Sequence, residues 1–102
     1  MSEQPTQPAE GQQAEQVSFI GFVISLASTA AVHFGDVANP VSGDKGEPDL
    51  VAAKQMIDIL SLLEQKTRGN LTAEERSVLE QVLYELRMRF VQAVTVEQRS
   101  KP

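Results

Sequence analysis

The chain contains three segments rich in apolar residues, separated by polar stretches. The first segment, residues 17–34, reads VSFIGFVISLASTAAVHF and carries no formal charge while its histidine is neutral. Apolar side chains go almost all the way round a helix of this sequence. Such a helix is either buried by several neighbours or placed in a membrane. We therefore expect a helix over residues 17–34 in a non-aqueous environment.

The other two segments are expected to form an antiparallel helical hairpin. Within residues 49–68, apolar residues follow helical spacing in two rows, which implies two neighbouring elements. Within residues 73–95 they recur four and three residues apart, as in a coiled coil. The connection between these helices is very short, and short connections join antiparallel neighbours.

Local signals mark the ends of these helices. Gly35 is placed to end the first helix in a left-handed conformation, and Gly69 to end the second. Asp49 can cap the free amides at the start of the second helix. Thr72 and Glu75 have the spacing of a capping box, which predicts the start of the third helix.

These elements predict an all-α fold with one domain over residues 17–96. It is a three-helix arrangement with a buried apolar first helix, a loop over residues 35–49 and the C-terminal hairpin. Residues 1–16 are polar, contain two prolines and show no apolar periodicity, so we expect a disordered tail. Residues 97–102 are expected to form a flexible C-terminal tail.

Composition narrows the classes of function. The net charge is −5, which disfavours nucleic acid as a partner. The chain has no cysteine, which excludes disulfide scaffolds, cysteine-ligated zinc and thiol nucleophiles. Residues 1–16 lack the basic start of a secretory leader, and we expect a cytoplasmic protein.

No pattern in the sequence indicates catalysis. No nucleophile is paired with a base at a recognisable spacing, and there is no glycine-rich phosphate loop. His33 has no partner histidine or cysteine for a metal. Asp58 lies four residues after Lys54, and an ion pair within the helix or between subunits is expected for it. Arg89 lies four residues after Glu85, in the favourable order for an ion pair within a helix. We predict no catalytic, cofactor-binding or metal-binding residue, and no enzyme.

The amount of apolar surface favours self-association. A domain of this size gains little from a single core, and dimerisation would add burial. We predict a homodimer or larger assembly, acting as a structural or protein-interaction module, with the first helix at its centre. A further, unidentified protein partner is compatible with this hypothesis. The predicted interface consists of Phe19, Phe22, Ser25, Leu26, Thr29, Leu83, Leu86 and Phe90.

Two alternatives belong to other classes. A membrane-associated protein would use residues 17–34 as a lipid-facing helix, and the spacing of Gly21, Ser25 and Thr29 is typical of membrane helix contacts. Against this, no Lys or Arg occurs before Lys45, and there is no Trp or Tyr belt. The third hypothesis is a small enzyme with an unrecognised site.

The chain also resembles a known family. The stretches SFIGFVISLASTAAVHFG and AAKQMIDILSLLEQKTRGNLTAEERSVLEQVLYELRMRFV are similar to the bacterial domain-of-unknown-function 1844 family. The similarity covers about residues 17–94, and its most specific part runs from Ile57 to Thr72. It implies a small helical bacterial protein and supplies no catalytic residues.

Overall fold

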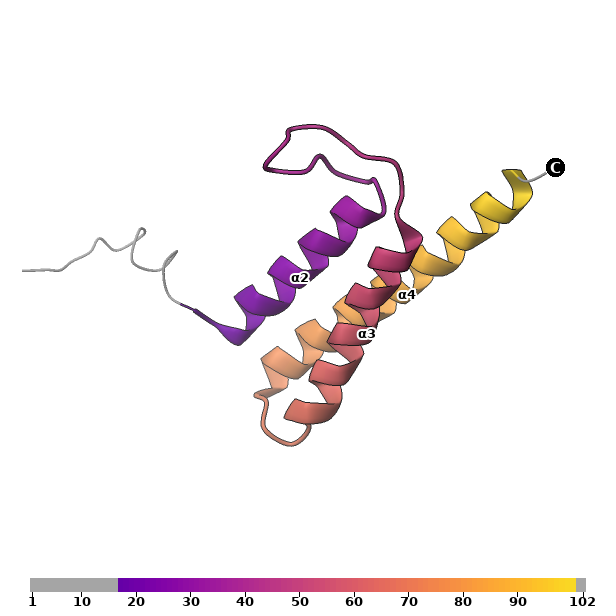
Figure 1. The fold of residues 1–102 in the computed structure, drawn as a ribbon. Coiled ribbons are helices and arrows are strands. Elements are labelled where there is room, and N and C mark those ends of the chain that lie inside the picture. The colour runs from indigo at the N-terminus through magenta and orange to yellow at the C-terminus, as the bar shows by residue number, and fades with distance from the viewer. Residues whose placement is uncertain (1–16, 101–102) are drawn as a thin grey trace, which may run out of the picture.

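The computed structural model describes residues 17–100, which form three helices and no strand (Figure 1). They are α2 (Phe19–His33), α3 (Leu50–Thr67) and α4 (Ala73–Ser100). The predicted all-α fold is therefore confirmed. The tail predicted for residues 1–16 lies outside the described residues.

Local hydrogen bonds fix both ends of α2. The Ser18 hydroxyl accepts from the amide of Gly21 at 2.9 Å, so the helix begins just after Ser18. At the other end, the amide of Gly35 donates to the carbonyl of Val32, and Gly35 has a φ of 79°. Glycine adopts this left-handed conformation without a Cβ clash, as predicted for a helix stop.

The boundary signals in the hairpin are also confirmed. The Asp49 carboxylate accepts from the amide of Ala52 at 3.0 Å, and Gly69 has a φ of 83°. Thr72 and Glu75 form the reciprocal capping box: the Thr72 hydroxyl accepts from the Glu75 amide at 3.1 Å, and the Glu75 carboxylate accepts from the Thr72 amide at 2.9 Å.

Helix α4 is longer than the sequence predicted. It continues to Ser100 instead of ending near residue 95, so the prediction of a tail from residue 97 is wrong for residues 97–100. No Gly or Pro occurs between residues 91 and 100, so nothing in this stretch breaks the helix. Arg99 in the last turn also favours the negative end of the helix dipole. In Figure 1, this end of α4 projects past the start of α3.

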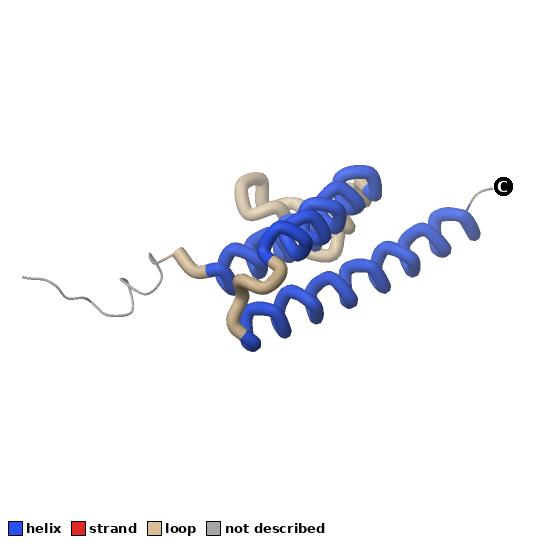
Figure 2. The backbone as a smooth tube through the Cα atoms, turned by 90° about the horizontal axis from the view of Figure 1, so that it is seen from below, coloured by secondary structure: helices blue, strands red, loops and turns tan. Residues whose placement is uncertain are grey.

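Each of the three helices contacts the other two. Helices α3 and α4 run in opposite directions, and α2 lies beside α3 (Figure 1). Seen from below, α4 runs along one side of the molecule, while α2 and α3 overlap in the view (Figure 2).

All three helices contribute to one hydrophobic core. Its buried members come from α2, the residue that follows it, α3 and α4: Val23, Ala30, Phe34, Ala53, Met56, Ile57, Leu60, Leu79, Val82 and Leu83. Within the single chain only two residues of α2 are buried. The burial of the whole first helix was predicted together with self-association and stays a prediction. Helices α3 and α4 cover one side of α2 and leave the other open.

Candidate interaction surface

The open side of α2 has an unusual composition for an exposed surface. Gly21, Ser25, Ser28 and Thr29 lie there, flanked by two large apolar side chains, Phe22 and Ile24, which are 46% and 48% exposed; we call these six residues the α2 outer face. The core residues of α2 project from the opposite side of the helix. The α2 outer face carries no charge, whereas exposed helix faces are normally polar or charged.

The hydroxyl groups of Ser25 and Thr29 on this face already have partners within the helix. The Ser25 hydroxyl donates to the carbonyl of Phe22 at 2.7 Å, and the Thr29 hydroxyl donates to the carbonyl of Ser25 at 3.1 Å. Burying a polar group is costly mainly when its hydrogen bond is lost. The α2 outer face could therefore be covered by apolar surface without leaving these donors unsatisfied.

A hollow continues this face toward the loop after α2. It has a volume of about 450 Å³ and lies between the last turns of α2 and the segment 37–40. Ser28 and Thr29 belong to both the hollow and the α2 outer face, and Val32, Val37 and Pro40 make its lining largely apolar. The open side of α2 is thus partly concave, which suits the side chains of a partner.

A second exposed apolar surface lies on α4. Tyr84, Met88 and Val91 are 61%, 53% and 59% exposed, and their spacing of four and three residues places them in one line along the helix. We call these residues the α4 stripe. The buried Leu79 and Leu83 project from the opposite side of α4. The helical spacing of these three residues is visible in the sequence, but the sequence alone does not show which side of α4 is exposed.

An ion pair joins α4 to the loop after α2. Arg89 donates to the two carboxylate oxygens of Asp36, from Nε at 2.8 Å and from Nη2 at 2.6 Å. Its guanidinium also lies over the Phe34 ring, 5.0 Å from the centroid. The prediction that Arg89 pairs with Glu85 is wrong: the fold brings Asp36 to it, and Glu85 accepts from Gln81 instead.

This ion pair makes stability depend on acid pH. The hydrogen bonds from Arg89 hold the pKa of the Asp36 carboxyl below its usual value. A lowered folded-state pKa stabilises the fold above the unfolded-state pKa, and this contribution is lost as the pH falls through the folded-state pKa. The Arg89 and Asp36 side chains are 32% and 40% exposed, which limits the contribution to about 1 kcal/mol.

We therefore expect Asp36→Asn to lower the free energy of unfolding at neutral pH by about 0.5–1 kcal/mol. Since the substitution removes the carboxylate, the variant should lose less stability than the wild type when the pH falls from neutral to about 3. Urea denaturation at both pH values measures this. Lys54→Gln, which removes the ion pair of Lys54 with Asp58 instead, is the control and should lose as much stability as the wild type between the two pH values. If Asp36→Asn and the wild type lost the same stability on acidification, the ion pair of Asp36 with Arg89 would not be the cause of the pH dependence.

The family model described as "Domain of unknown function (DUF1844)" matches residues 16–92. The chain belongs to this family. All of α2 and α3 and most of α4 lie within the DUF1844 match, as do the α2 outer face and the α4 stripe. No curated protein and no solved structure matches the chain significantly.

The eight residues predicted for the interface differ in how far they are exposed in the DUF1844 domain. Phe22, Ser25 and Thr29 lie on the α2 outer face. Leu83 must be removed from the predicted interface, because it is 1% exposed and belongs to the chain's own core. The other four are partly buried against that core: Phe19, Leu26, Leu86 and Phe90.

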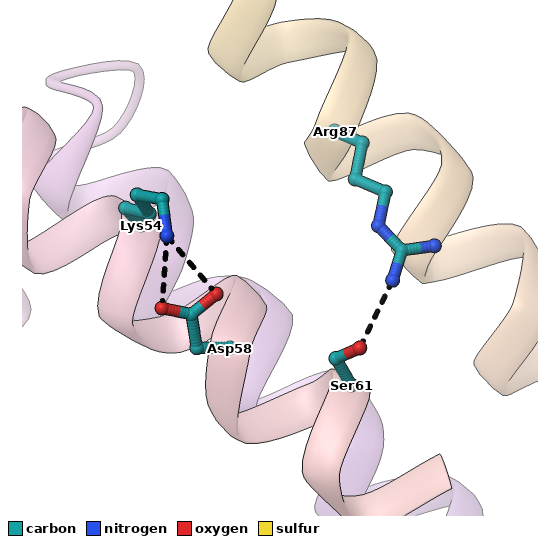
Figure 3. Close-up of polar contacts among 4 residues, drawn as sticks. All are labelled: Lys54, Asp58, Ser61 and Arg87. Atoms are coloured by element: carbon teal, nitrogen blue, oxygen red, sulfur yellow. Dashed lines mark hydrogen bonds and ion pairs between the residues drawn. The ribbon is translucent and has the colours of Figure 1, made fainter. Parts of the chain in front are cut away.

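Polar contacts on the other helices serve the structure of the DUF1844 domain. The predicted pair of Lys54 and Asp58 is confirmed at 3.1 Å, and Arg87 donates to Ser61 across the hairpin at 3.1 Å (Figure 3). The carbonyl of His33 accepts from the amide of Asp49, which ties the end of α2 to the start of α3.

Two further features are absent from the described part of the chain. Among residues 17–100, no three His, Asp or Glu side chains lie close enough together to hold a metal ion. In the same range, no helix is long and apolar enough to cross a membrane.

Proposed function

We propose that this DUF1844 protein is a self-associating helical module without catalytic activity, in which two copies meet through the α2 outer face. One observation carries the proposal: α2 presents an uncharged face with two half-exposed large apolar side chains, although the helix belongs to the core of the chain. A second copy offers the same uncharged face, and a two-fold dimer brings identical patches together.

The chemistry of the face favours close packing of two helices. Small residues at positions 21, 25, 28 and 29 allow helix axes to approach closely, with Phe22 and Ile24 packing on either side. Full burial of such a side chain contributes about 1.5–3 kcal/mol, so covering the exposed half of each contributes about 1 kcal/mol. In a symmetric dimer both copies contribute these side chains, so each contribution occurs twice.

The proposal assigns no catalytic role to the hydroxyl residues. Ser25 and Thr29 donate to helix carbonyls, and Thr72 caps α4. These three hydroxyl groups therefore have structural hydrogen-bond partners.

Ser25→Arg tests the proposal. Arginine at the centre of the α2 outer face would place a charge between the two helices, and burying an unpaired charge is strongly unfavourable. We expect the mass measured by light scattering after size-exclusion chromatography to fall by half or more, with unchanged helix content by circular dichroism.

Gln55→Arg is the matched control, since it adds the same side chain to an exposed position of α3. It should keep the wild-type mass. A folded Ser25→Arg chain that assembles to the same mass as wild type would show that copies do not meet at the α2 outer face.

A further inference from the structure

We propose that a second copy of the chain also packs along α4, antiparallel, so that the two α4 stripes face each other. The inference rests on the proposed self-association but uses a different surface. Its evidence is the exposure of Tyr84, Met88 and Val91 and the distribution of charge along α4, neither of which involves α2.

The shape of α4 suits this contact. With 28 residues it is the longest helix, and its outer side is uncovered along its length (Figure 2). Three large apolar residues spaced as in one half of a coiled coil form a line along that side. A lone exposed apolar residue needs no explanation, whereas a continuous exposed apolar row marks an interaction surface.

The charges along α4 select the direction of the partner. Residues 73–85 contain four glutamates and one arginine, and residues 86–100 contain three arginines and one glutamate. Two parallel α4 helices would therefore bring like charges together. Arg87 and Arg89 already bind Ser61 and Asp36 within the chain, which leaves Arg99 near the end of α4. An antiparallel pair brings this end of each helix to the acidic start of the other, which is the favourable arrangement.

The register follows from the stripe. When Tyr84 of one copy lies opposite Val91 of the other, symmetry places the second Tyr84 opposite the first Val91, and the two Met88 side chains meet near the centre. In this register Arg99 of each copy comes within one turn of Glu74 of the other, on the same edge of the interface. The contact between the two α4 stripes and the pairing of Arg99 with Glu74 thus favour the same antiparallel register.

Pairing through the α4 stripe extends the proposed self-association, because each chain then has two symmetric interfaces. One uses the α2 outer face and the other the α4 stripe. The simplest closed assembly with two different two-fold interfaces is a tetramer of dihedral symmetry. We therefore expect the full assembly to contain four chains.

Charge substitutions at the two faces separate the two proposals. Met88→Arg in the full chain is expected to convert the tetramer to a dimer held through α2, with unchanged helix content. The double variant Ser25→Arg/Met88→Arg should be monomeric. Gln65→Arg, at an exposed position of α3, is the matched control and should assemble like wild type.

Each other outcome has a definite meaning. If Met88→Arg leaves the mass unchanged both in the wild type and in the Ser25→Arg background, copies do not pair through α4, and the α2 proposal is judged on Ser25→Arg alone. If Met88→Arg gives monomers while Ser25→Arg has no effect, the pairing through α4 stands and the α2 proposal fails.

Disulfide cross-linking tests the direction of the helices, because the chain has no cysteine of its own. Met88→Cys should form a disulfide dimer under mild oxidation, since the two residues meet at the centre. Arg99→Cys should not, because the two ends of an antiparallel pair are about 35 Å apart at 1.5 Å per residue. Cross-linking at both positions would mean parallel helices, and cross-linking at neither would exclude the contact; either result overturns the proposal.

Discussion

Replacing Leu60 with alanine will lower the free energy of unfolding by about 2–5 kcal/mol. Leu60 is fully buried in α3, in a core to which all three helices contribute. Truncation removes buried methyl groups and leaves a cavity that the three helices can close only in part. A domain of this size has a total stability of about 5–10 kcal/mol, so the loss should be a large fraction of it. Urea denaturation followed by circular dichroism measures the change.

Leu62→Ala is the matched control, because Leu62 lies in the same helix and is 52% exposed. The same truncation there should cost less than about 1 kcal/mol, since surface substitutions rarely change stability more. Equal losses at the two positions would contradict the orientation of α3 described above.

Val23→Asp will detach α2 from the hairpin or unfold the chain. Val23 is fully buried on the inner side of α2, and α2 has no basic residue other than His33 in its last turn to pair with a new carboxylate. An unpaired buried charge costs several kcal/mol, which is a large part of the stability of a domain of this size. We expect a loss of helix content near neutral pH and a lower melting temperature, both followed by circular dichroism.

The neighbouring substitution Ile24→Asp separates burial from hydrophobicity. Ile24 is about half exposed in the single chain, so a carboxylate there does not disturb the chain's own core and the helix content should change little. It lies on the α2 outer face, however, and should weaken assembly. If Ile24→Asp destabilises the chain as strongly as Val23→Asp, the distinction between the inner and outer sides of α2 is wrong.

Features set by residues close in sequence could be predicted. The Asp49 cap, the Thr72 and Glu75 capping box and the left-handed Gly35 each depend on hydrogen bonds or conformations within a few residues. The ion pair of Lys54 and Asp58 is of the same kind, one turn apart on one helix. For such contacts the sequence determines the geometry almost directly.

Features set by packing could not be predicted. Arg89 has a potential partner one turn away in Glu85, yet it binds Asp36, which is 53 residues distant and is brought close only by the packing of α2 on α4. The apolar sequence of α2 predicted burial on all sides, but two neighbouring helices cover one side of a helix. Leu83 was assigned to an interface because a stripe in the sequence does not reveal whether it faces the chain's own core or a second copy.

The most direct test of self-association is the mass of the untagged wild-type chain in solution without detergent, measured by sedimentation equilibrium over a range of concentrations. The monomer has a mass of 11.2 kDa. Self-association through the α2 outer face predicts a mass of at least twice this value, and the additional α4 contact predicts four times. A folded chain that sediments as a monomer at every concentration would contradict the central claim that its exposed apolar faces bind a second copy.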